Sequence, residues 1–187
     1  MKQNLKYVLK LFLTLLFSAF ASFMIAISFA VIFAKSSGWI FYTFTQAFTL
    51  ILLVALIWQT VYDIGFKDSN MVRTGHRNED ILRGFKVGAA AQIPWLIGLL
   101  LSFAFNIRFS FYRIFNSVYW TFLTLASGTV KAEKIAEIKM RDIGAVGITV
   151  TFLLLLIVPI VSGAVYILGY KGIDVFSKLV YKKRKEK

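Results

Sequence analysis

Four long stretches of the chain carry no Asp, Glu, Lys or Arg, and this absence constrains the fold more than any other feature. They run over residues 11–34, 39–62, 87–107 and 143–170, so each has at least 21 residues. An α-helix rises about 1.5 Å per residue, and about 20 apolar residues are needed to cross a hydrocarbon core about 30 Å thick. The sequence therefore predicts four transmembrane helices over these ranges.

The composition also indicates a membrane protein. Hydrophobic residues make up 58% of the 187 residues and charged residues 17%, whereas soluble domains average about 45–50% and about 25%. The net charge of +13 would suggest nucleic acid for a soluble protein, but in a membrane protein basic residues report topology and contact with anionic headgroups. We expect a single membrane domain over residues 1–187, a lipid bilayer with anionic headgroups as its partner, and no nucleic acid.

Aromatic residues crowd the segment at about 108–128, between the third and fourth predicted spans. Arg108 and Arg113 interrupt it, and an arginine at the bilayer centre is costly. We therefore expect an interfacial or re-entrant helix here, within an amphipathic region over 108–142. The predicted fold class is an all-α integral membrane protein with four transmembrane helices plus this aromatic helix.

The distribution of basic residues predicts the orientation. With four spans, the N-terminus, the polar connector 63–86 and the tail 171–187 share one side and hold three, five and seven basic residues, 15 in all, against 7 on the other side. Since positively charged loops stay in the cytoplasm, both termini are expected to be cytoplasmic. The compact, lysine-rich and cysteine-free chain suggests a bacterial plasma membrane protein.

The basic tail contains apolar residues at helical spacing, which suggests an amphipathic segment on an anionic leaflet. The alternative is a solvated tail that only reports topology. The expected headgroup contacts are Lys178, Lys182, Lys183, Arg184 and Lys185.

Small residues recur at every fourth position of the first span, at Ser18, Ser22, Ala26, Ala30 and Ala34. On a helix these positions share one face, where another backbone can approach closely. The stripe either packs against the protein's own spans or docks a partner: another membrane protein or a second copy of the chain.

The Ala-xxx-Ala spacing over Ala26–Ala34 is similar to the first-helix pattern with which S-components of energy-coupling-factor vitamin transporters contact their transmembrane scaffold. The resemblance implies a substrate-binding subunit of a transporter. S-components have six spans, whereas this sequence predicts four.

Two further sets of residues are candidates for contacts between helices. Gly84 and Gly88 form a second small-residue face before and within the third span. Gln46 and Gln92 lie inside spans, where a glutamine can hydrogen-bond across helices or bind a polar solute. The second role predicts a polar cavity between the spans.

The connector 63–86 is expected to be a solvated loop, with Gly65 and Ser69-Asn70 as turns. A membrane enzyme that used this connector would bring His76 together with Asp68 or Glu79. The acidic residues do not match the calcium-loop spacing, the chain has no cysteine, and His76 is its one histidine. We therefore assign no catalytic, cofactor-binding or metal-binding residue.

The spans hold no charged residue, which argues against an autonomous ion-coupled carrier. The function expected from the sequence is a non-catalytic polytopic membrane protein that packs with partner helices through the small-residue stripe. A small-solute transport component and a membrane enzyme using the connector remain as alternatives.

Overall fold

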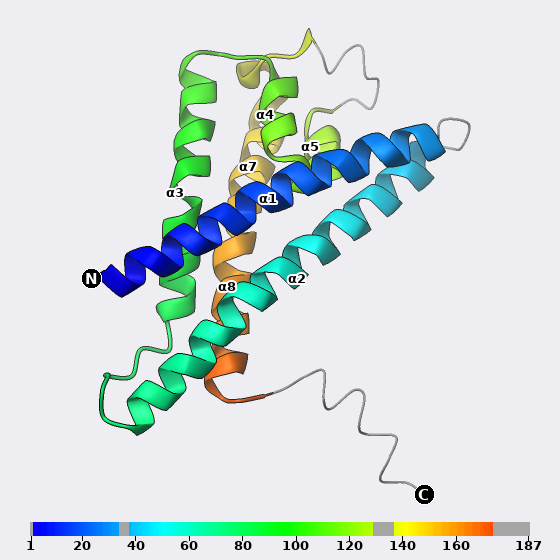
Figure 1. Cartoon of the computed structure of the whole chain (residues 1–187). Coiled ribbons are helices and arrows are strands. Elements are labelled where there is room, and N and C mark those ends of the chain that lie inside the picture. Colours follow the sequence, from blue (N-terminus) through cyan, green and yellow to red (C-terminus); the bar gives the residue numbers. More distant parts are fainter. Residues whose placement is uncertain (1, 34–37, 129–136, 174–187) are drawn as a thin grey trace, which may run out of the picture.

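The computed structural model describes residues 2–33, 38–128 and 137–173, and these residues form helices and no β-strand (Figure 1). The α-helices are α1 (Lys2–Ile32), α2 (Gly38–Arg73), α3 (Arg83–Ala104), α4 (Phe109–Phe115), α5 (Trp120–Ala126), α7 (Gly144–Leu155) and α8 (Ile157–Tyr170). Two short 3-10 helices, η1 (Ser117–Tyr119) and η2 (Met140–Ile143), precede α5 and α7. The all-α prediction is confirmed for the described residues.

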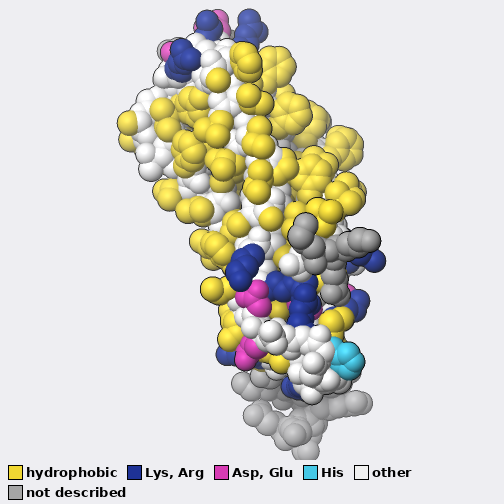
Figure 2. Space-filling model, turned by 90° about the vertical axis from the view of Figure 1, so that its left-hand side faces the viewer, with side chains coloured by type: hydrophobic (Ala, Val, Ile, Leu, Met, Phe, Trp, Pro, Cys, Tyr) yellow, Lys and Arg dark blue, Asp and Glu magenta, His cyan; other side chains and the backbone are white. Residues whose placement is uncertain are grey.

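Four helical segments are long and apolar enough to cross a membrane, as the charge-free stretches predict. They are Asn4–Ile32, Gly38–Arg73, Arg83–Ala104 and Met140–Tyr170. The face seen in Figure 2 agrees, because a broad band of hydrophobic side chains separates two ends at which charged side chains gather. Soluble monomers rarely expose so extensive an apolar surface. The architecture therefore fits a multi-pass membrane protein.

The second long helix extends further than the sequence pattern predicts. It continues to Arg73, so Gly65 and Ser69-Asn70 lie inside α2 instead of forming turns. Gly65 is a contact point, because a Cβ there would collide with the backbone oxygen of Tyr166 on α8. The first half of the connector 63–86 is thus a helix packed against α8, which corrects the expectation of a solvated loop.

The fourth span is interrupted where α7 ends and α8 begins. Pro159 lacks an amide hydrogen, and its ring conflicts with the carbonyl group four residues earlier, at Leu155. At the break, the Leu156 N–H donates to the Leu153 oxygen, three residues earlier, at 3.0 Å. This bond forms a 3-10 turn, which is tighter than an α-helical turn. Pro94, the other proline of the chain, lies inside α3, which continues past it.

Helix α8 packs closely against both α2 and α3, and glycines make this possible. A Cβ on Gly88 would come within 2.9 Å of the Pro159 Cα, and one on Gly84 would overlap Tyr166. On the other side, a Cβ on Gly169 of α8 would collide with the Tyr62 oxygen of α2. The absence of side chains therefore lets the three backbones approach closely.

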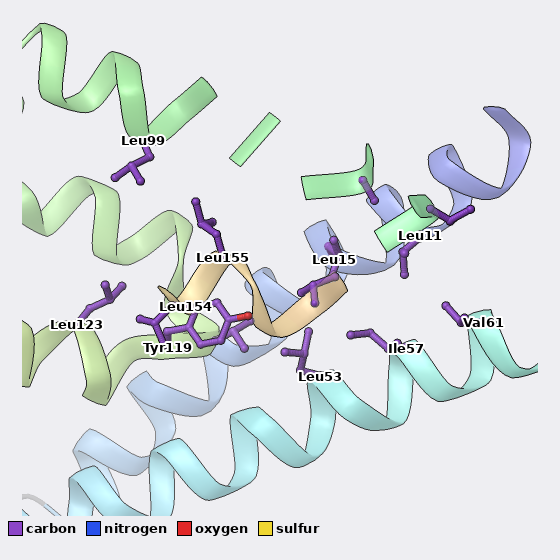
Figure 3. Packing of buried hydrophobic residues seen from close by; sticks show 14 of the residues in the cluster. Leu11, Leu15, Leu53, Ile57, Val61, Leu99, Tyr119, Leu123, Leu154 and Leu155 are labelled. Carbon is purple, nitrogen blue, oxygen red and sulfur yellow. The ribbon is translucent and has the colours of Figure 1, made fainter. Parts of the chain in front are cut away.

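The hydrophobic core forms where α1 crosses the other helices (Figures 1 and 3). Leu11 and Leu15 of α1 lie near Leu53 and Ile57 of α2 (Figure 3), and all four side chains are at most 4% exposed. Leucines of α3, α5 and α7 extend the same cluster. This core fixes the α1–α2 pair against the remaining helices.

Candidate functional site: an apolar groove beside a helical hairpin

The aromatic segment folds back on itself, with α4 leading into η1 and α5 returning. Arg113 Nη1 donates to Thr124 Oγ1 at 3.0 Å, which joins α4 to α5. Both ends of this hairpin lie beside the start of the fourth span: Met140 N–H donates to the Ile107 oxygen at 3.0 Å, and a Cβ on Gly147 would come within 2.6 Å of the Ala126 oxygen. The segment enters and leaves at one end of the bundle, as a re-entrant segment requires.

The tip of the hairpin reaches the middle of α1 and the first third of α2. Ser117 Oγ donates to the backbone oxygen of Ala19, halfway along α1. Thr49 of α2 donates its hydroxyl to the Val118 oxygen at 2.9 Å, and Thr121 donates its hydroxyl to the Tyr42 oxygen at 2.8 Å. Hydrogen bonds to α1 and α2 therefore hold the tip at this depth.

Gln46 is the main anchor of the hairpin. Its Nε2 donates to the Val118 oxygen at 2.9 Å, and its Oε1 accepts from the Thr121 N–H at 3.1 Å. Thr121 lies in the first turn of α5, where backbone N–H groups have no partner within the helix. Gln46 is 6% exposed, so these bonds replace solvation that the apolar surroundings do not provide.

Arg113 is held inside the hairpin. Its guanidinium lies over the Trp120 ring, 4.1 Å from the centroid. Together with the bond to Thr124, this cation–π contact offsets part of the cost of removing the charge from water. The Trp120 ring therefore helps to hold this arginine in place.

An apolar groove of about 640 Å³ runs between α1, α3 and the hairpin. Ala19, Gly98 and Ser102 are the small residues in its wall, and a Cβ on Gly98 would meet no atom within 4 Å. The remaining wall is mostly aromatic and aliphatic, and it includes Phe20, Phe105 and Phe115. These three phenylalanines are at least 64% exposed, so the groove is open at the surface of the bundle.

A smaller cavity of about 20 Å³ adjoins the deep end of the groove, and Trp95, Phe115 and Asn116 line both. Gln92 and Tyr119 also line this cavity. The Gln92 Oε1 and the Tyr119 hydroxyl are buried and have no hydrogen-bond partner among the described residues. A space of this size accommodates about one water molecule. Gln46 and Gln92 therefore do not share a solute-sized cavity.

A buried charged cluster joins the long helices at the opposite end of the bundle. Asp68 of α2 forms an ion pair with Arg83 at the start of α3, and its other oxygen lies 2.6 Å from Arg77 Nη1. The Tyr166 hydroxyl of α8 donates to Asp68 at 3.0 Å, and Arg83 Nη2 donates to Asn4 Oδ1 of α1 at 2.6 Å. We call Asn4, Asp68, Arg77, Arg83 and Tyr166 the basal cluster.

His76 lies outside the basal cluster. Its Nδ1 is 2.9 Å from Thr74 Oγ1, and its side chain is exposed. Asp68 contacts Arg77, Arg83 and Tyr166. In the part of the chain that the structure describes, no hydrogen bond or ion pair joins His76 to Asp68 or to Glu79, the two arrangements that an enzyme of the connector would need. Among the described residues, no three His, Cys, Asp or Glu side chains lie close enough to hold a metal ion.

The small-residue stripe of the first span divides in two. Ser18, Ser22 and Ala26 are at most 3% exposed, and α1 packs against α2, α3 and the hairpin. Ala30 is exposed, whereas Ala34 and the headgroup candidates Lys178, Lys182, Lys183, Arg184 and Lys185 lie outside the described residues. Most of the stripe therefore contributes to packing within the chain.

Comparisons with protein-family models, with curated proteins and with solved structures find no match to this chain. The site must therefore be interpreted from its own geometry.

The sequence pattern did not predict the basal cluster, nor that Gly98 would line an open groove. A signal for the cluster was present, since Val61, Ile64 and Asp68 recur at helical spacing and share one face of α2. An acidic residue on the continuation of a buried face indicates a buried partner. For Gly98 there was no such signal, because its role depends on the distance between α1 and α3.

We predict that Gln46→Leu loosens the hairpin whereas Gln92→Leu does not. The first change leaves the buried Thr121 N–H without its acceptor, which costs about 1–3 kcal/mol. The second removes an oxygen that has no partner, so stability should stay the same or rise. Unfolding free energies in detergent and hydrogen exchange at residues 117–122 measure both effects, and equal losses in the two variants would contradict this role of Gln46.

We predict that Asp68→Asn destabilises the fold strongly, by about 3–5 kcal/mol, because it leaves the buried Arg83 without a counter-charge. Asp80→Asn is the matched control: Asp80 lies 3.0 Å from Lys86, and both side chains are at least 40% exposed. Loss of this exposed pair should cost at most about 1 kcal/mol. The measurement is the midpoint of chemical unfolding, and similar midpoints for the two variants would argue against the basal cluster as a structural anchor.

Proposed function

We propose that this chain is a non-catalytic, multi-pass membrane module that binds the hydrocarbon chain of a bilayer amphiphile in the groove between α1, α3 and the hairpin. The observation that supports this proposal is the groove itself. Its volume of about 640 Å³ lies in the usual range of about 300–1,000 Å³ for ligand sites. Its wall is almost entirely apolar, so its natural occupant is an apolar chain.

The position of the groove in the bundle favours an occupant that comes from the bilayer. The open side is bordered by the exposed Phe20 of α1, Phe105 after α3 and Phe115 of α4. Helices α1 and α3 have the length and composition of membrane spans. In a bilayer this side faces lipid, so an amphiphile reaches the groove by lateral diffusion. The hairpin is then a re-entrant segment whose tip is buried in protein, as irregular backbone at membrane depth requires.

The other functions suggested by the sequence receive less support. A partner subunit docking on the small-residue stripe would need a free surface, but Ser18, Ser22 and Ala26 are buried within the chain. A small polar solute would need a cavity at Gln46 and Gln92, and the space beside Gln92 is about 20 Å³. The proposal retains a bacterial plasma membrane location, which the compact, lysine-rich and cysteine-free chain suggests. It also retains both termini in the cytoplasm, because of the distribution of basic residues.

We predict that Gly98→Leu blocks the groove without disturbing the fold. A side chain at position 98 meets open space, and leucine has a higher helix propensity than glycine. The amount of lipid that remains bound after purification in detergent should fall several-fold, with an unchanged or higher unfolding midpoint. Native mass spectrometry measures the bound lipid.

Leu100→Phe is the matched control for this experiment. Leu100 lies on the same helix, is 52% exposed and is not part of the groove wall. This variant should retain lipid as the wild type does. Undiminished lipid in the Gly98→Leu protein would refute the groove as a binding site.

A further inference from the structure

The groove is about one leaflet deep, and this depth indicates what kind of amphiphile fits. Along α3 and the residue that follows it, its wall extends from Pro94 to Phe105, which is about 16 Å at about 1.5 Å per residue. Half of a hydrocarbon core about 30 Å thick is about 15 Å. The groove thus begins near the middle of the membrane and ends at one surface, as an acyl chain of a single leaflet does.

Basic residues lie at the surface end of the groove. Ile107 is the last wall residue there, and it is followed by Arg108, whose backbone pairs with that of Lys139 in an isolated β-bridge. Arg108 is exposed, and no described carboxylate lies within ion-pair distance of it. Arg108 thus places a positive charge with no described counter-charge next to the last wall residue of the groove.

The other charges around the mouth leave it cationic. Arg141 donates from Nε and Nη2 to the oxygens of Phe103 and Ala104 at the end of α3, and it retains its positive charge. Asp142 accepts from the backbone N–H of Lys139 at 3.3 Å. Among the described residues around this turn, Arg108, Lys139 and Arg141 outnumber the carboxylates of Glu137 and Asp142. The surplus of positive charge complements a negative headgroup.

From this depth and charge we infer that the ligand of the groove is an anionic phospholipid of the leaflet on the Arg108 side, with one acyl chain in the groove and its phosphate at Arg108. This inference rests on the proposed function and adds the headgroup class to it. An arginine near a membrane surface favours an anionic lipid over a neutral lipid about fivefold.

The test measures quenching of Trp95, which lines the groove, by lipids with brominated acyl chains. The protein carries Trp39→Phe, Trp58→Phe and Trp120→Phe, so Trp95 is its one remaining tryptophan. Phenylalanine at position 120 keeps an aromatic ring for the contact with Arg113. It is reconstituted into vesicles of phosphatidylcholine and phosphatidylglycerol at a fixed ratio. Two samples are compared: in one the phosphatidylcholine is brominated, and in the other the phosphatidylglycerol. Both samples contain the same mole fraction of brominated chains.

The expected result is about fivefold stronger association of Trp95 with brominated phosphatidylglycerol than with brominated phosphatidylcholine. Arg108→Gln should bring the two lipids close to parity. Lys86→Gln removes the same charge at the other end of α3, where Lys86 is 3.0 Å from Asp80, and should leave the preference intact.

Three outcomes would overturn the inference, and they separate it from the proposed function. If both lipids quench Trp95 equally and Gly98→Leu abolishes this quenching, the groove binds an acyl chain but does not select the headgroup. If Trp95 still prefers brominated phosphatidylglycerol in the Gly98→Leu protein, the anionic lipid binds outside the groove. That result would remove support for the proposed function and for this inference. Quenching that falls as the protein-to-lipid ratio rises would indicate that a second copy of the chain occupies the groove.

Discussion

The structure depends on one constraint: a backbone that turns inside an apolar bundle must find all its hydrogen-bond partners in the protein. Gln46 meets this requirement for the hairpin, because one side chain supplies a donor to Val118 and an acceptor to Thr121. Hydrocarbon provides neither group, and each unsatisfied backbone group there costs several kcal/mol. The hairpin in turn forms one wall of the groove, so the groove exists because Gln46 holds the hairpin at depth.

The two ends of the bundle differ in a way that follows from their chemistry. At the basal cluster, one carboxylate links α2 to α3, α8 and the segment that carries Arg77, and Arg83 extends the link to α1. Close glycine contacts between α8 and its neighbours reinforce this end. At the other end the hairpin separates α1 from α3 and leaves the groove between them. The fold is thus tightly joined at one end and accessible at the other.

Much of the fold could be predicted from the sequence because the bilayer imposes simple rules. Charge-free stretches predicted the four long apolar helices, and the cost of burying Arg113 predicted that its segment would not form a further span. The end of α2 could not be predicted in this way. Gly65 and Ser69-Asn70 are typical of turns, but here they lie on a helix because packing against α8 outweighs local propensity.

The groove could not be predicted from the sequence, since it depends on where α1 and α3 move apart. Gln46 was recognised as a polar residue in a span, but its partners are backbone groups more than 70 positions away in the chain. Gly98 has no neighbour within 4 Å of a built Cβ, and nothing in its local sequence distinguishes it from Gly84 or Gly88, which contact α8. Long-range geometry decided each case.

Whether the hairpin enters and leaves on one side of the membrane can be tested by cysteine labelling, because the chain has no cysteine of its own. Arg108→Cys and Ser127→Cys mark the two ends of the hairpin, and His76→Cys marks the connector after α2. For a re-entrant hairpin, we expect a membrane-impermeant maleimide to reach positions 108 and 127 from the same side of the membrane and position 76 from the opposite side. Labelling of positions 108 and 127 from opposite sides would contradict it.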